Sequence, residues 1–423
     1  MSILAIHGGT PARKQPLPPN YPGAMLFGEE ERAASERIIQ AQSPFRYYGA
    51  NPQHTVLQLE NAMRDKLGVP YALGVTSGTA ALIVALRAVG VGAGDKVIVP
   101  ANTFLATATA VICCNAVPVF ADIDRSLNID PLALEAAMDE EVKAIIAVPI
   151  LGTPCDMDPI MAFGRKHGIA VIEDVAQSCG VVYRGRYQGT IGDAGAFSFQ
   201  MNKVITAGEG GAVVMKRADY FERAVRYHDQ GSLRERTRYG FDSPDELGAF
   251  AGQNYRMSEL TGSVMLEQWS KLDTITQSMR KHHKQIRAAL SSRHEGLEFR
   301  YSPDESGDLG SNLGLILPDA AEAERFSYAL QAENINSFVL YGGQPVYKQP
   351  QIWHQRTIER DNFPFSYPFK KPVVYRDGLC PTAENLIPRT VFVPISPLLT
   401  DEDADEIAAG IGKVAEWLSV RSG

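Results

Sequence analysis

The stretch "YALGVTSGTAALIVAL", residues 71–86, places an apolar run directly before a segment with the composition of a buried helix. The run from Tyr71 to Val75 has the length and apolar character of a buried strand. Two hydroxyl residues, a glycine and a third hydroxyl residue follow, and residues of these kinds cap the start of a helix. The stretch therefore predicts a strand that passes through a tight turn into a helix.

The same alternation continues on both sides of this unit, from about residue 26 to residue 220. Further short apolar runs occur at "KVIVP", "VPVFAD", "KAIIAVPI", "IAVIED", "GAFSF" and "GAVVM", and between most of them lie segments of helix length, such as "FLATATAVICC", "DPLALEAAM" and "PIMAFGRKHG". Strands that alternate with helices indicate a mostly parallel sheet covered by helices on both faces. The predicted fold class is therefore α/β.

The whole sequence divides into three predicted parts. Residues 1–25 contain five prolines and are expected to form an extended arm. Residues 26–275 make the large α/β domain, and a long helical pattern over residues 256–290 leads out of it. Residues 276–423 predict a smaller α+β domain, with strands at "LGLIL" and "INSFVL" and helices at "AAEAERFSYALQAE" and "DEDADEIAAGIGKVAEWL". Within it, residues 341–390 are rich in proline and aromatics and predict a long loop, a kind of segment that is often functional.

Composition excludes several classes of partner. The net charge of −8, from 41 basic and 49 acidic residues, gives no broad positive field for nucleic acid or an anionic membrane. The longest apolar stretch, "LATATAVICCNAVPVFAD", contains Asn115 and Pro118 and predicts a helix followed by a strand rather than a membrane span. The start "MSILAIHGGTPARK" does not resemble a secretory signal.

Neither a metal site nor a disulfide framework is indicated. The five cysteines lack metal-type spacing and a disulfide pattern, which favours a reducing cytoplasm. His282 and His283, inside "RKHHKQ", are expected on a solvated helix face rather than in a metal site.

The ends of the predicted strands hold the candidate site residues, because ligands of parallel sheets bind at the carboxyl ends of the strands. After the first strand, Gly78 and Thr79 offer backbone N–H groups and a helix dipole to an anion, although a plain helix cap would look the same. The strand "AVIED" ends in Glu173 and Asp174. Side chains alternate between the two faces of a strand, so only one of these carboxylates can face a given site, and the sequence pattern does not show which one. Phe104 follows another strand, and its ring either offers a flat aromatic face to a ligand or packs in the core.

Lys203 lies in "GAFSFQMNKVITAGEGGAVV", residues 195–214, shortly after Ser198. One interpretation is a solvated loop lysine. The other is a desolvated lysine with a lowered pKa, which is a nucleophile toward carbonyl carbons. An anion site, a carboxylate, an aromatic ring and a lysine at the ends of one sheet are the parts that hold pyridoxal phosphate, so the combination favours the second interpretation.

The motifs "SGTAAL", "GDKVIVPANTF", "IEDVAQS", "GAFSFQMNKVITAGEGGAVV" and "NYRMSEL" are similar to those of the DegT/DnrJ/StrS sugar aminotransferases. The resemblance runs from about residue 26 to the C-terminus. It implies fold type I of the pyridoxal-phosphate transferases, in which a large domain with a mostly parallel seven-stranded sheet between helices precedes a smaller α+β domain.

The resemblance also implies a role for each matching residue near the cofactor ring. Lys203 would be the Schiff-base lysine, and Asp174 would be the partner of the pyridine nitrogen. Gln177 would neighbour the phenolic oxygen, and Phe104 would stack on the ring. Because the lysine is retained, transamination is favoured over dehydration.

The cofactor phosphate is expected to bind at a second group of matching residues. Gly78, Thr79 and Ser198 would hold it within one subunit. Asn254, in "QNYRM", would reach the phosphate of the other subunit. This last role implies a homodimer whose sites lie at the subunit interface.

The segments "LAIHGGTPAR" and "LYGGQPVYKQPQIW" look most like the glutamine:scyllo-inosose branch of the family. The expected reaction therefore moves an amino group from L-glutamine or L-glutamate to a keto-cyclitol or keto-sugar in aminoglycoside or other secondary metabolism. Alternatives are amination of a nucleotide-linked keto-deoxysugar, a lyase, decarboxylase or oxidase reaction on the same scaffold, and a cofactor-binding sensor. The arginines that could bind the carboxylate of the amino donor are Arg226, Arg234, Arg236, Arg238 and Arg256.

Overall fold

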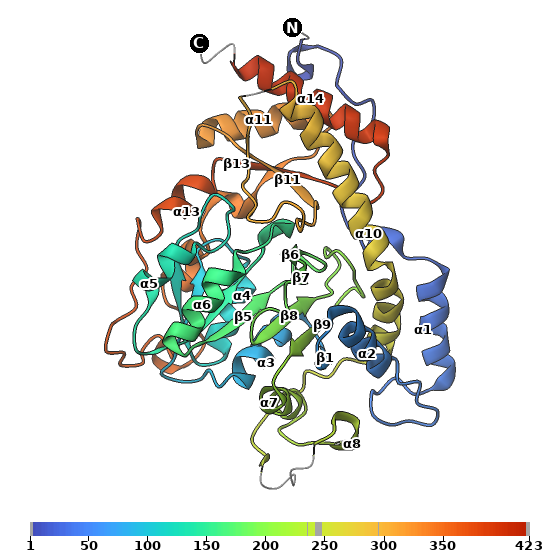
Figure 1. Cartoon of the computed structure of the whole chain (residues 1–423), viewed down its shortest axis with the longest axis vertical. Helices are drawn as coiled ribbons and strands as arrows, with labels where there is room; N and C mark the ends of the chain where they lie inside the picture. The colour runs from blue at the N-terminus through green and yellow to red at the C-terminus, as the bar shows by residue number, and fades with distance from the viewer. Residues whose placement is uncertain (1–2, 235, 242–247, 295, 420–423) are drawn as a thin grey trace.

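The computed structural model describes residues 3–234, 236–241, 248–294 and 296–419 (Figure 1). At its centre lies a seven-stranded sheet of order β1-β9-β8-β5-β4-β2-β3. The strands are β1 (Tyr71–Val75), β2 (Lys96–Pro100), β3 (Val117–Ala121), β4 (Val142–Ala147), β5 (Ala170–Asp174), β8 (Ala194–Ser198) and β9 (Gly211–Met215). The predicted α/β class and seven-stranded sheet are confirmed.

One strand runs against the others. β9 pairs antiparallel with both β1 and β8, whereas the pairs β8-β5, β5-β4, β4-β2 and β2-β3 are parallel. β8 and β9 are neighbours in the sheet, so the chain between them turns back at the carboxyl end of β8. This turn contains Lys203, and its base is closed by backbone hydrogen bonds from Phe199 to Gly210 and from Ala207 to Phe199. The reversal therefore places the lysine at the edge of the sheet where ligands bind.

Helices cover both faces of this sheet, as its mostly parallel strands require. The helices of this part of the chain are α1 (Glu29–Ala41), α2 (Thr55–Leu67), α3 (Gly78–Ala88), α4 (Leu105–Cys113), α5 (Leu134–Ala137), α6 (Met157–His167), α7 (Ala218–His228) and α8 (Arg236–Tyr239). α3, α4 and α7 share one buried apolar cluster, and α2 belongs to a second cluster that continues into the C-terminal part. The segment "DPLALEAAM" forms only a 3-10 turn (Pro131–Ala133) and the single turn α5, because Leu134 alone of these two elements is buried.

The long helix α10 (Glu259–Ser291) leads from the large sheet to the C-terminal part (Figure 1). There a four-stranded antiparallel sheet has the order β10-β11-β13-β12, formed by β10 (Glu298–Phe299), β11 (Asn312–Ile316), β12 (Phe338–Val339) and β13 (Thr390–Pro394). α11 (Ala320–Ala332) packs on it, and α14 (Asp401–Ser419) packs on α10 and α11. β13 was not predicted, and β12 covers only Phe338 and Val339 of the predicted strand at residues 335–340; the chain bends at Tyr341, whose φ is +51°, soon after it.

The segment from residue 341 to residue 390 is ordered rather than a plain loop. It contains short helical turns, namely Leu340–Gly343, Val346–Lys348, α12 (Pro350–Trp353), Arg360–Asn362 and α13 (Pro381–Leu386). It packs along the outer edge of the large sheet, where the Tyr375 hydroxyl donates to the carbonyl of Pro118 in β3 at 2.7 Å. A small hairpin of β6 (Val182–Tyr183) and β7 (Arg186–Tyr187) completes the strands. Among the described residues, no helix is both long and apolar enough to cross a membrane.

Candidate active site

A cavity of about 750 Å³ opens at the carboxyl ends of the central strands. Residues that follow β1, β2, β5 and β8 line it, because parallel strands end at the same edge of the sheet. Of the predicted site residues, Gly78, Thr79, Phe104, Asp174, Gln177, Ser198 and Lys203 line this one cavity.

One wall of the cavity is the start of α3. Ser77 caps this helix, and its hydroxyl accepts a hydrogen bond from the backbone N–H of Ala80 at 3.0 Å. The neighbouring helix start at Gly78 and Thr79 faces the cavity, where unpaired N–H groups and the helix dipole favour an anion. A Cβ atom on Gly78 would lie 2.6 Å from Cβ of Ser198, so only glycine permits this approach. The resulting recess has the chemistry of a phosphate site.

Asp174 ends β5 with its side chain on the cavity, and it is only 4% exposed. The Thr107 hydroxyl donates to its Oδ2 at 2.8 Å, and the backbone N–H of Ala176 donates to its Oδ1 at 3.2 Å. Burial raises the pKa of Asp174, while these hydrogen bonds and the charge of Lys203 act against that shift. A buried carboxylate of this kind is suited to a cationic partner, such as a protonated ring nitrogen.

Glu173, the other carboxylate of the pair, lies on the opposite side of the strand. It accepts hydrogen bonds from the backbone N–H groups of Ile191 at 2.6 Å and Gly192 at 2.7 Å. Strand alternation left open which of the two carboxylates faces the site. In the structure Asp174 faces the cavity, whereas Glu173 accepts backbone hydrogen bonds inside the protein.

Lys203 lines the cavity from the turn between β8 and β9. Burial lowers its pKa, and the negative charges of Asp174 and Glu209 oppose that shift. Within the described parts of the chain, its Nζ has no hydrogen-bond or ion-pair partner. The lysine is therefore not a solvated loop residue, and a lowered pKa makes its amine a better nucleophile near neutral pH.

Phe104 and Gln177 lie near a residue that the sequence analysis did not single out, Tyr341. The Phe104 ring is 55% exposed, and its centroid lies 6.2 Å from that of Tyr341. The Gln177 amide nitrogen donates to the Tyr341 hydroxyl at 2.7 Å, while Gln177 Oε1 is buried without a partner among the described residues. An exposed aromatic ring and an unpaired buried oxygen at one cavity are features of a ligand site. Thr107 was also missed, and neither residue carries a motif of its own.

Asn254 does not line the cavity. It is exposed and forms an isolated backbone bridge with Asp229. Its expected role toward another subunit stays a prediction.

Of the candidate arginines, Arg226, Arg234, Arg238 and Arg256 do not line the cavity either. Arg226 pairs with Glu222, Arg234 and Arg256 pair with Asp229, and Arg238 donates to the carbonyl of Arg46. The side chain of Arg236 falls outside the described residues.

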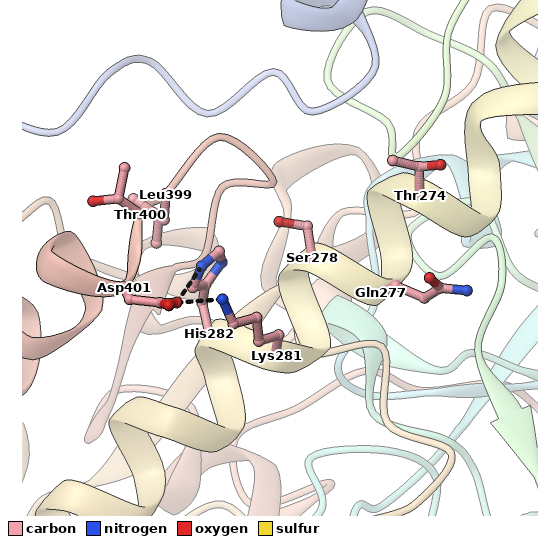
Figure 2. A pocket seen from close by; sticks show the side chains of 8 residues that line it. All are labelled: Thr274, Gln277, Ser278, Lys281, His282, Leu399, Thr400 and Asp401. Carbon is pink, nitrogen blue, oxygen red and sulfur yellow. Dashed lines mark ion pairs between the residues drawn. The ribbon is translucent and has the colours of Figure 1, made fainter.

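A second, shallow hollow lies between α10 and the start of α14, and none of its lining residues lines the first cavity (Figure 2). Figure 2 shows Asp401 facing both Lys281 and His282, and His282 Nε2 lies 3.5 Å from Asp401 Oδ1. The expectation of a solvated His282 is wrong, because that side chain is only 4% exposed under the start of α14. Nothing in this hollow resembles the chemistry of the first cavity.

Comparison with known proteins agrees with this geometry. The family model for the DegT/DnrJ/EryC1/StrS aminotransferases matches residues 29–412. The chain is 31% identical over 435 residues to the L-glutamine:2-deoxy-scyllo-inosose aminotransferase of Streptomyces paromomycinus, and the match covers 99% of each chain. It is 40% identical over 219 residues to the GDP-perosamine synthase of Caulobacter vibrioides, covering 52% of this chain and 57% of that protein.

Solved structures show the same architecture. 3-Amino-5-hydroxybenzoic acid synthase superposes with a TM-score of 0.80 at 25% identity, covering 95% of this chain and 100% of that chain. DesV of S. venezuelae, solved in complex with a ketimine intermediate, superposes with a TM-score of 0.77 at 26% identity, covering 92% and 94% of the two chains.

Proposed function

Because the chain belongs to the DegT/DnrJ/EryC1/StrS aminotransferase family, we propose that it transfers an amino group with pyridoxal 5'-phosphate as cofactor. The observation that carries this proposal is the set of groups around one cavity: a half-buried lysine with no partner among the described residues, a buried carboxylate and a helix start with room for a phosphate. These groups match the aldehyde, the ring nitrogen and the phosphate of that cofactor.

Each residue then has a defined task. Gly78, Thr79 and Ser198 would hold the phosphate, and Asp174 would keep the ring nitrogen protonated. When bound, the cofactor supplies an electron sink that stabilises negative charge on the substrate carbon. Lys203 would bind the aldehyde carbon at rest, and its released amine would move the proton during turnover. Its lowered pKa keeps more of that amine neutral.

We propose L-glutamine as the amino donor and a keto-cyclitol as the acceptor. This assignment is supported by relatives from Streptomyces paromomycinus and Streptomyces lividus, which are named L-glutamine:2-deoxy-scyllo-inosose aminotransferases; the second is 37% identical over 314 residues, covering 72% of this chain and 70% of that protein. The lysine and the carboxylate serve both half-reactions, so ping-pong kinetics should follow.

We further propose a cytoplasmic homodimer in which Asn254 of one subunit reaches the phosphate of the other. Asn254 is exposed and does not line the cavity of its own subunit, which supports this role. All five cysteines are free thiols, which supports a reducing compartment.

Two measurements test the function. Borohydride reduction of the protein purified with pyridoxal phosphate should attach the cofactor to the peptide that contains Lys203, and the Lys203→Ala variant should not be labelled. Incubation with L-glutamine and 2-deoxy-scyllo-inosose should release keto acid and aminated ring in equal amounts. Labelling without conversion by any amino donor would contradict the transaminase assignment, and release of CO2 or peroxide would indicate a lyase, decarboxylase or oxidase.

A further inference from the structure

The N-terminal arm, residues 3–25, is fixed at its first end on the C-terminal part. Glu333, which is fully buried, accepts hydrogen bonds from the backbone N–H groups of Ala5 at 2.8 Å and Ala12 at 2.7 Å. Arg13 forms an ion pair with Asp403 at 2.7 Å. Because these groups are buried or half-buried, this end of the arm is held in place.

The second end of the arm is fixed on the turn that carries Lys203. A Cβ atom on Gly23 would lie 2.8 Å from Cα of Ile205 and 2.8 Å from Oε1 of Gln268, so the arm backbone contacts this turn closely. The backbone N–H of Met25 donates to the carbonyl of Tyr21 at 2.9 Å. Residues 20–22, which lie between the two anchors, line the same cavity as Lys203.

Asn20 brings an unpaired polar group to this wall. Its Oδ1 is buried and has no hydrogen-bond partner within the described residues. A buried carbonyl oxygen without a partner destabilises the protein unless a ligand or water donates to it. Gln177 Oε1, on another wall of the same cavity, is in the same situation. Because Gln177 is assigned to the cofactor under the proposed function, Asn20 Oδ1 is the acceptor left for a ligand with hydroxyl groups.

The charges that this chain brings to the cavity favour an acceptor without phosphate groups. Among the described residues that line it, the ionisable carboxylates are Asp174 and Glu209, and the one cation is Lys203. Under the proposed function, Lys203 and Asp174 are occupied by the cofactor. No lining arginine or second lysine of this chain is left for the phosphates of a nucleotide-linked sugar.

We propose that Asn20 is a specificity-determining residue that accepts a hydrogen bond from a ring hydroxyl of a neutral polyhydroxylated acceptor, and that the arm is a fixed wall of the acceptor subsite. This inference rests on the proposed aminotransferase function. The two anchors hold Asn20 in position before the acceptor binds, which reduces the entropy lost on binding.

The first test separates the two half-reactions of the Asn20→Ala variant. One neutral hydrogen bond contributes about 1 kcal/mol, so the KM for 2-deoxy-scyllo-inosose should rise about fivefold. The rate at which L-glutamine converts the cofactor aldehyde to the amine, followed by absorbance without acceptor, should stay the same. The control is Gln15→Ala, which removes an exposed amide of the same arm and should change neither value.

The second test measures binding without turnover. In a Lys203→Ala background loaded with pyridoxamine phosphate, calorimetry should give about a fivefold weaker dissociation constant for the acceptor when Asn20→Ala is added. An acceptor affinity within twofold of the parent, or an equal loss in the L-glutamine half-reaction, would overturn the proposal. A wild-type protein that L-glutamine fails to convert would instead contradict the proposed function, so the two failures are distinguishable.

Discussion

The Gln177 side chain donates a hydrogen bond of 2.7 Å to the hydroxyl of Tyr341. This bond joins the loop after β5 to the start of the segment 341–390. Burial raises the pKa of Tyr341 and keeps its hydroxyl protonated. The contact fixes the Gln177 amide at the cavity, where the phenolic oxygen of the proposed cofactor would lie.

Tyr341→Phe tests this contact, since it keeps the ring beside Phe104 and removes only the hydroxyl. Loss of one neutral hydrogen bond should lower kcat/KM about fivefold and shift the absorbance maximum of the bound cofactor. The exposed Tyr328→Phe substitution is the matched control. A variant with the parent's spectrum and kinetics would show that Tyr341 does not act on the site through Gln177.

Asp174→Asn should separate cofactor binding from turnover. Removal of one partner of a buried ion pair costs about 3–5 kcal/mol, so kcat should fall by more than about a hundredfold while cofactor is retained. Stopped-flow measurement of the L-glutamine half-reaction gives the rate. Equal turnover would remove Asp174 from the mechanism.

The same substitution should stabilise the protein without cofactor. Burial raises the pKa of Asp174 in the folded state, so its contribution to stability is present at acidic pH and is lost as pH rises through that pKa. The neutral amide avoids this loss. Thermal unfolding of cofactor-free samples at neutral pH should therefore give a higher Tm for Asp174→Asn than for the parent.

Gly78→Ala should weaken cofactor binding and stability together. The new methyl would lie 2.6 Å from Cβ of Ser198, and overpacking of this kind costs about 1–3 kcal/mol. Titration of cofactor-free protein with pyridoxal phosphate should show at least about a fivefold weaker dissociation constant. Gly296→Ala, whose Cβ has no atom within 4 Å, is the control. An unchanged affinity would argue against a phosphate site at this helix start.

His228 should make the protein less stable in acid. Burial and the nearby guanidinium of Arg46 lower the pKa of His228 to about 3. Between that value and the ordinary value near 6.5, the unfolded chain binds a proton that the folded chain does not. The free energy of unfolding should therefore fall below pH 6.5, by up to about 1.4 kcal/mol per pH unit for this group.

Denaturant unfolding measured from pH 7 to pH 4 checks this dependence. The slope should be smaller in His228→Gln, which does not titrate, and unchanged in the exposed control His354→Gln. The same slope in the parent and in His228→Gln would contradict the assignment.

The sequence by itself determined the α/β class, the seven strands of the large sheet and the residues at their ends. These features follow from local pattern, because apolar runs, helical spacing and turn residues are set by neighbours in the chain. Gly78, Phe104 and Lys203 could be named as candidates because each lies within five residues of the end of a strand.

Only the tertiary structure decided how distant parts meet. It placed Asp174, which the family resemblance had singled out over Glu173, on the cavity, brought Tyr341 to Gln177, and brought Asn20 of the arm to the cavity that Lys203 lines. Thr107, β13 and the buried His282 were missed for the same reason. Each depends on packing between segments far apart in the chain, and local periodicity carries no information about that packing.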